Sequence, residues 1–144
     1  MTARTKIAFW CYVLLIIAVA GWGMNFLLRS EFTDYHSVAV GMSWSEVPSS
    51  LQVLILACLK LAGGLWLAFS LAALVILLLP FRQGAPWALW AVPMLLVAQF
   101  LAPVPAMTLV ITNTPATPPW VMTVLGIVMA MFGLVVPLSE QRRA

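Results

Sequence analysis

The chain has 144 residues, of which 64% are hydrophobic and 8% are charged, and its formal net charge is +3. Its mean hydropathy is +1.08. So few polar side chains cannot cover a soluble globule of this size, which excludes an ordinary soluble domain. The basic residues are scattered rather than clustered, so the charge gives no support for nucleic-acid binding. Most of the outer surface is expected to face lipid.

Four apolar runs are each long enough to cross the hydrocarbon core of a bilayer, which takes roughly 20 helical residues. Lipid offers the backbone no hydrogen-bond partners, so these runs are expected to be helices, and they lack the alternation of a barrel strand. The sequence predicts an all-α fold: a four-helix transmembrane bundle with a structured extracytoplasmic cap between helices 1 and 2, forming one domain over residues 1–144. The four predicted spans are residues 7–28, 51–79, 85–111 and 118–138.

The first predicted span follows two basic residues, Arg4 and Lys6. A basic start, an apolar stretch and small residues near position 20 also resemble a cleavable signal peptide. The apolar run continues to Leu28, however, which makes it long enough to cross a bilayer. We therefore expect an uncleaved transmembrane helix.

The first connection, residues 29–50, is too apolar for a solvated loop. Its aromatic side chains include Phe32, Tyr35 and Trp44, which suits a short interfacial helix or a packed turn. We expect this connection to fold over the outer end of the second span and to form the cap.

Lys60 is the charged residue inside the second predicted span. A rise of about 1.5 Å per residue puts it roughly 30 Å from Pro80, which is the whole hydrocarbon thickness, so it should lie near the outer boundary. Lys60 also begins a row of small residues at four-residue spacing, Gly64, Ala68 and Ala72. Such a row lets another helix approach closely, so the lysine is expected to point toward protein.

A half-buried lysine needs a partner, and Glu31, Asp34 or Glu46 of the first connection could supply a carboxylate. One interpretation is a structural ion pair, or a lysine that reaches the interface. The other is an outward-facing polar pocket for a small molecule or a lipid headgroup. The candidate ligand-binding residues of that pocket are Lys60, Asn25, Gln99, Tyr35, His36, Asp34 and Glu46.

Prolines shape the third predicted span, residues 85–111. Pro93 removes an internal hydrogen bond and should bend the helix, while Pro103 and Pro105 should disrupt its outer end. Gln99 lies just before that disruption. Broken helices at such depth can line a binding site, although neighbouring helices can also simply accommodate the prolines.

Basic residues at the ends of the spans predict the orientation. One side of the predicted topology carries Arg4, Lys6, Arg82, Arg142 and Arg143. The opposite side carries Arg29 alone. Both the N- and the C-terminus are therefore expected to be cytoplasmic, and the first connection extracytoplasmic.

The sequence contains no recognisable catalytic or cofactor motif. His36 is the single histidine, whereas a haem between helices usually takes two. No His/Cys spacing supports a metal site, and no G-x-S-x-G elbow is present. We expect no catalytic residue, no metal and no cofactor. An enzyme is less favoured than a non-enzyme, and a membrane enzyme built on Asp34, His36 and Glu46 stays as a third hypothesis.

Several segments carry a resemblance to a known group of proteins: Phe32-Thr33-Asp34-Tyr35-His36, residues 39–44, residues 51–54, and the turn over residues 80–88 that begins Pro80-Phe81-Arg82. They resemble small uncharacterised bacterial four-helix inner-membrane proteins in the neighbourhood of DoxX-like proteins, and the likeness spans most of the chain. The resemblance implies this architecture and a multi-pass location in the bacterial inner (plasma) membrane. It implies no catalytic residues.

Two classes of function lead. We expect a non-catalytic polytopic membrane protein that acts by association, as an accessory subunit or a homo-oligomer, through its small-residue helix faces. The alternative is a binder or carrier of a small amphipathic ligand, a lipid or a quinone, in an outward-facing polar pocket around Lys60. The expected partners are membrane lipids and either a protein partner or a second copy, with no nucleic acid.

Overall fold

The computed structural model describes residues 1–141, with side chains described for residues 1–136. The protein is all-α, as the sequence predicts: 81% of it is helical, and the described residues contain no strand. In chain order the elements are α1 (Ala3–Leu28), α2 (Asp34–Val40), the 3-10 turn η1 (Trp44–Glu46), α3 (Ser49–Ile76), the π-helical turn η2 (Leu77–Phe81), α4 (Ala88–Leu101), α5 (Val104–Asn113) and α6 (Trp120–Gln141).

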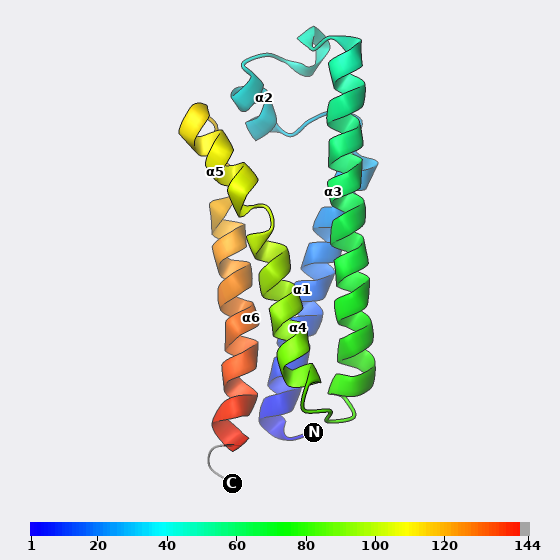
Figure 1. Ribbon diagram of the computed structural model, residues 1–144, viewed down its shortest axis with the longest axis vertical. Coiled ribbons are helices and arrows are strands. Elements are labelled where there is room, and N and C mark those ends of the chain that lie inside the picture. The colour runs from blue at the N-terminus through cyan, green and yellow to red at the C-terminus, as the bar shows by residue number, and fades with distance from the viewer. Residues whose placement is uncertain (142–144) are drawn as a thin grey trace.

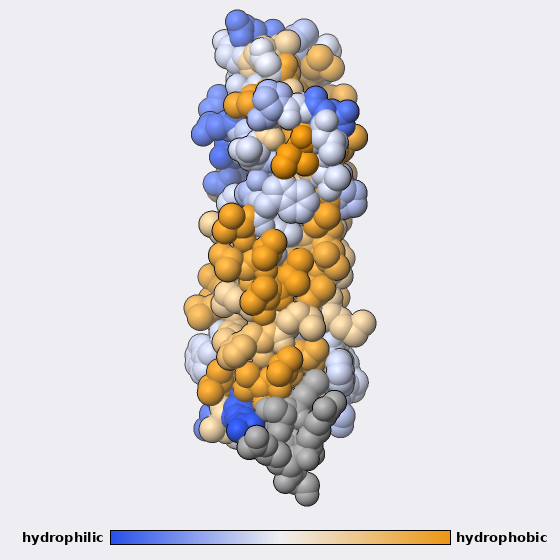
Figure 2. All heavy atoms as spheres, turned by 90° about the vertical axis from the view of Figure 1, so that its left-hand side faces the viewer, coloured by the Kyte–Doolittle hydropathy of each residue, from blue (hydrophilic) through white to orange (hydrophobic). Residues whose placement is uncertain are grey.

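Three helical segments are long and apolar enough to cross a membrane, namely α1, α3 continued by η2, and α4 continued by α5. The described apolar part of α6, Trp120–Val136, is shorter. Positions 137 and 138 of the fourth predicted span lie outside the described side chains. On the face shown in Figure 2, a band of apolar side chains lies below the polar end that carries α2.

The long helices pack side by side in pairs (Figure 1). α1 contacts α3 and α6, and α4 contacts α6 and α3. The side chains that these pairs share are large and fully buried, and they form one core at the end of the molecule where α1 begins. The largest are Tyr12, Phe81, Leu77, Leu96 and Val92.

The third predicted span is broken where its prolines predict. α4 ends at Leu101 and α5 begins at Val104, with Pro103 between them and Pro105 in the first turn of α5. Pro93 is accommodated inside α4 and is buried. Figure 1 shows α5 leaving the line of α4 at this break. The disruption is therefore confirmed.

α1 and α3 touch backbone to backbone where Gly23 meets Gly63. A Cβ added to Gly63 would lie 2.6 Å from the carbonyl oxygen of Gly23, and a Cβ added to Gly23 would lie 2.9 Å from that of Gly63. No larger side chain fits between the helices at this depth, so the two glycines set the closest approach.

The row of small residues that begins at Lys60 does not take part in this contact. A Cβ on Gly64 would meet no atom within 4 Å, and Ala68 and Ala72 are exposed. The face that α3 buries carries Leu59, Gly63, Ser70 and Ala73 instead. Gly63 and Gly64 point to different faces of α3, so the predicted row stays open to a helix from outside the described residues.

The first connection is ordered and packs on the beginning of α3. It runs over residues 29–48, because α3 begins at Ser49. Phe32 and Trp44 meet edge to face with ring centroids 4.9 Å apart, and Phe32 is buried together with Val47 and Leu59. The expected packing of this connection over α3 is therefore present.

Alanine substitutions at the two adjacent glycines of α3 should have opposite effects. Gly63→Ala should lower the free energy of unfolding by about 1–3 kcal/mol, because the added methyl group forces α1 away. Gly64→Ala should be neutral or stabilising by up to about 0.5–1 kcal/mol, because alanine is the better helix former. Thermal and denaturant unfolding in one detergent, followed by circular dichroism, measures both. Equal effects would contradict the observed crossing.

Candidate functional site

A cavity of about 310 Å³ lies between α1, α6 and the break that separates α4 from α5. The exposed side chains on its rim are Ala18 and Trp22 of α1 and Met122, Leu125 and Met129 of α6. The mouth therefore lies between α1 and α6, on the outside of the molecule. Closer to the N-terminus of α1 the two helices touch, and a Cβ on Gly133 would lie 2.6 Å from the Tyr12 ring.

The wall of this cavity is apolar and rich in aromatic rings. None of the described residues that line it is charged. Polar side chains come from Tyr35 and Thr123, and the Thr123 hydroxyl donates to the sulfur of Met107 at 3.7 Å. The aromatic residues of the wall are Trp22, Phe26, Tyr35, Trp66 and Phe100. Such a surface suits hydrocarbon chains and flat rings.

Two hydrogen bonds to Trp66 and a close contact at Gly126 fix the side chains at the base of the cavity. The main-chain carbonyl of Trp66 accepts from the Gln99 amide nitrogen at 3.0 Å and from the Ser70 hydroxyl at 2.8 Å. The Trp66 and Phe100 rings meet edge to face, 6.5 Å apart. Phe100 packs directly on the backbone of Gly126, where any Cβ would collide with its ring. Gln99 thus positions α4 against α3 and does not line the cavity.

Lys60 binds the end of α1. Its ammonium donates to the carbonyl oxygens of Leu27 at 2.8 Å and of Arg29 at 3.4 Å. The last carbonyls of a helix have no partner within the helix and carry its negative dipole end, so a cation is favourable there. The expected direction toward protein is observed for the ammonium, although the residue as a whole is exposed.

The carboxylate partner expected for Lys60 is not found among the described residues. Glu46 accepts from the backbone nitrogen and the hydroxyl of Ser43, both at 2.7 Å, and caps η1. These bonds lower the pKa of Glu46. Asp34 and Glu31 are exposed. The prediction was wrong because the free carbonyls of α1 lie closer to Lys60 than any carboxylate side chain does.

Asn25 also acts locally. Its side-chain oxygen accepts from the Arg29 side chain at 3.1 Å, and the same guanidinium reaches the carbonyl of Phe32 at 3.5 Å. Asn25 is exposed and does not line the cavity. Together these bonds fix the path by which the chain leaves α1.

Tyr35 and His36 sit on α2, at the polar end of the cavity. Their rings stack with centroids 4.0 Å apart, and Tyr35 is part of the cavity wall. The His36 Nδ1 lies 2.7 Å from the Thr33 hydroxyl and forms the capping box of α2. Burial lowers the pKa of His36, with a smaller effect from the Arg29 charge. Burial raises the pKa of Tyr35, so at neutral pH its phenol keeps the proton and can donate it.

The structure thus distributes the predicted site residues over several roles. Tyr35 lines the cavity, and His36 and Gln99 support its wall. Lys60, Asn25, Asp34 and Glu46 lie outside the lining. The cavity residues that sequence reasoning missed are mostly apolar. In a chain that is apolar throughout, their residue types do not distinguish them from side chains that face lipid. The available signal was the proline break after Gln99.

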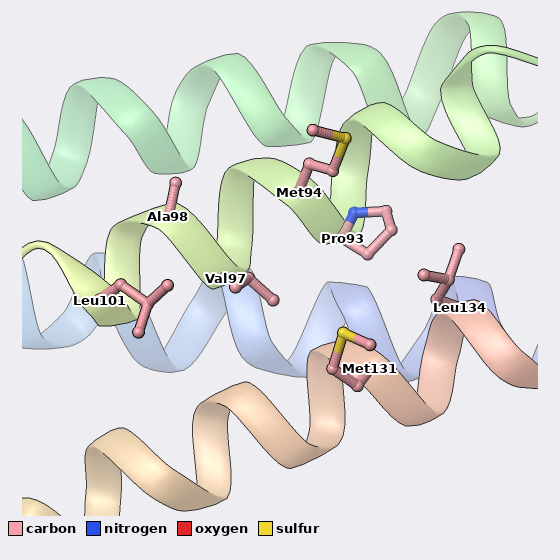
Figure 3. Close-up of a pocket in the computed structure, with 7 residues that line it drawn as sticks. All are labelled: Pro93, Met94, Val97, Ala98, Leu101, Met131 and Leu134. Atoms are coloured by element: carbon pink, nitrogen blue, oxygen red, sulfur yellow. The ribbon is translucent and has the colours of Figure 1, made fainter.

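A second, smaller cavity of about 220 Å³ lies between α4 and α6 (Figure 3). It is lined by apolar side chains alone, with Met94 and Leu101 on α4 and Met131 and Leu134 on α6 among them. No polar side chain is among the described residues that line it, so it offers little to orient a ligand.

The described residues contain no group of three or more His, Cys, Asp and Glu side chains that could hold a metal ion. No protein-family model, curated protein or solved structure matches the chain. The resemblance to DoxX-like proteins therefore stays a prediction.

Proposed function

We propose that the chain is an integral membrane protein that binds a small amphipathic ligand in the cavity between α1 and α6. The observation that carries this proposal is a cavity of about 310 Å³ with an aromatic, uncharged wall and a mouth between two apolar helices. Its volume falls at the lower end of the roughly 300–1,000 Å³ found for small-molecule sites.

The position of the mouth supports entry from the lipid phase. The rim residues Ala18 and Trp22 lie in the middle and outer part of α1, a helix long and apolar enough to cross a membrane. Met122 and Leu125 face them from α6 and are more than half exposed, at 62% and 52%. In a bilayer these side chains would contact acyl chains, so a dissolved lipid could move sideways into the cavity.

The site of this binder differs from the one that the sequence suggests. We place the ligand in the cavity between α1 and α6 instead of in the expected pocket around Lys60, and the two sites share Tyr35. A polar end at α2 and an apolar body between the helices match a ligand with one polar group and a hydrophobic remainder.

Filling the cavity should remove the ligand. Ala18→Phe places a ring in the mouth, and we expect most of any compound that copurifies with the wild-type protein to be lost. Ala57→Phe is the matched control, because Ala57 is exposed on α3 and does not line the cavity. Mass spectrometry of lipid extracts and of the intact protein in nanodiscs measures retention. Equal retention in both variants would reject the proposal.

In the same experiment, Lys60→Met separates the two placements of the ligand. Because Lys60 holds the end of α1 and does not line the cavity, its loss should loosen the fold and leave the copurifying compound in place. Loss of that compound from a folded Lys60→Met protein would indicate that the ligand binds around Lys60 instead of in the cavity.

We also propose the topology that the sequence predicts: four spans including α6, cytoplasmic N- and C-termini, and an extracytoplasmic cap, in a bacterial inner membrane. The supporting observation is that the start of α1 and the turn between η2 and α4 lie at one end of the molecule and the first connection at the other (Figure 1). Lys6 lies near the start of α1, and Arg82 directly follows η2. Arg142 and Arg143, which contribute to the same bias, lie outside the described residues.

Single cysteines can test this orientation. In a chain whose Cys11 and Cys58 are replaced by serine, Ser45→Cys in the first connection should react with a membrane-impermeant maleimide in intact cells. Gln83→Cys, in the turn at the opposite end, should react only after permeabilisation. Both positions are exposed. Labelling of Gln83→Cys in intact cells and of Ser45→Cys only after permeabilisation would show the opposite topology.

Self-association or association with a protein partner is the second candidate function. The observation that favours it is the row Gly64, Ala68 and Ala72, which is a small-residue face that no described part of the chain covers. In a membrane, such a face allows a second helix to approach closely.

A bulky residue should disrupt an interface on this face. Ala68→Phe should raise the dissociation constant of the assembly by about tenfold or more, again with Ala57→Phe as the control. Single-molecule photobleaching in bilayers at graded protein density gives the stoichiometry. An assembly that tolerates Ala68→Phe does not use this face.

A further inference from the structure

We infer that the ligand of the cavity is an uncharged, single-chain amphiphile whose hydrogen-bonding group lies at Tyr35. This inference rests on the proposed function and names the chemical class of the compound that the same site takes.

The absence of charge in the lining argues for an uncharged ligand. No described residue of the wall carries a charge. The nearby cations are already engaged: the Arg29 side chain binds Asn25 and the carbonyl of Phe32, and the Lys60 ammonium binds two carbonyls at the end of α1. A buried ion without an opposite charge or a set of hydrogen bonds is strongly disfavoured. A carboxylate, a phosphate or an ammonium group would find neither here.

The aromatic wall by itself could attract a cation through the faces of Trp22, Trp66 and Phe100. No carboxylate lines the wall to hold such a cation. The carboxylates of the first connection, on Glu31, Asp34 and Glu46, are exposed and lie outside the lining. A cationic ligand head inside the cavity would therefore be buried without an opposite charge.

The volume argues for a single chain. About 310 Å³ is near the minimum for a small-molecule site, and the α1–α6 mouth is the open side. One chain or one ring system can fill this space and extend through the mouth into the bilayer. A second acyl chain would not fit beside the first and would have to stay outside the mouth.

Tyr35 supplies the polar contact. No hydrogen bond of its phenol is found among the side chains described, residues 1–136, and a phenol can both donate and accept. The other hydroxyl of the wall, on Thr123, directs its proton to the Met107 sulfur. An alcohol, ester or ketone oxygen at Tyr35 would be satisfied by this single residue.

Brominated amphiphiles that differ only in the headgroup can test whether the site prefers an uncharged ligand. The full-length protein in phosphatidylcholine nanodiscs is titrated at neutral pH with dibromostearyl alcohol, dibromostearyl sulfate and dibromostearyl trimethylammonium. Bromine quenches nearby tryptophans, so the cavity residues Trp22 and Trp66 report occupancy. Mole fraction in the membrane is the concentration scale, which removes differences in partitioning.

We expect saturable quenching by the alcohol at a mole fraction at least about tenfold lower than by either charged probe, because a charge would be buried without a partner. Ala18→Phe should abolish the saturable component and Ala57→Phe should keep it. Ala18→Leu, a smaller change, replaces Ala18→Phe if that variant does not fold. Tyr35→Phe should weaken binding of the alcohol severalfold and leave binding of a dibrominated alkane unchanged.

The outcomes separate the two levels of the argument. Saturable, Ala18-dependent binding of a charged probe as tight as that of the alcohol overturns the neutral class and keeps the proposed function. An unchanged affinity for the alcohol in Tyr35→Phe overturns the position of the polar group. If no probe gives a component that Ala18→Phe removes, the cavity is not a binding site and the proposed function fails as well.

Discussion

The backbone contact between Gly23 and Gly63 is the constraint on which the rest of the arrangement depends. It holds α1 and α3 so close that the carbonyl oxygen of each glycine fills the space where a Cβ would stand. Leu27 lies one helical turn beyond Gly23, and this proximity brings its free carbonyl to the Lys60 ammonium. The lysine therefore caps α1 as a consequence of the helix crossing, and the first connection begins from a fixed point.

The same constraint leaves the space that becomes the cavity. α1 is held by α3 near Gly23 and by α6 near Tyr12, where Gly133 admits its ring. Between these contacts and the first connection, the cavity lies between α1 and α6, next to Pro103, where α4 ends and the chain turns into α5 (Figure 1). Aromatic side chains line the gap without filling it. The cavity thus follows from two glycine contacts and one proline break.

The sequence predicts those parts of the fold that are marked by a clear difference between neighbouring residue types. Apolar runs against polar turns predict the long helices, Pro103 predicts the break, and Phe32 and Trp44 in a connection predict its packing. It failed where one apolar or small residue had to be preferred over another. Gly63 and Gly64 are equally small, and only the phase of α3 relative to α1 decides which of them makes the contact. The cavity residues differ from lipid-facing ones in position and hardly at all in type, so the lining could not be recognised before the helices were placed.

The polar residues that first suggested a binding pocket mostly complete the local structure. Glu46 caps η1, His36 caps α2, Asn25 holds Arg29, and Lys60 closes α1. Each such bond satisfies a backbone or side-chain group that would otherwise lack a partner at the end of a helix. Tyr35 is the exception, since its ring reaches the cavity while its hydroxyl is left for another partner. The proposed site, whose neighbouring charges bind helix ends and whose wall offers one phenol, would discriminate by shape and by the absence of charge. Selectivity of this kind comes from the cost of burying the wrong group more than from attraction to the right one.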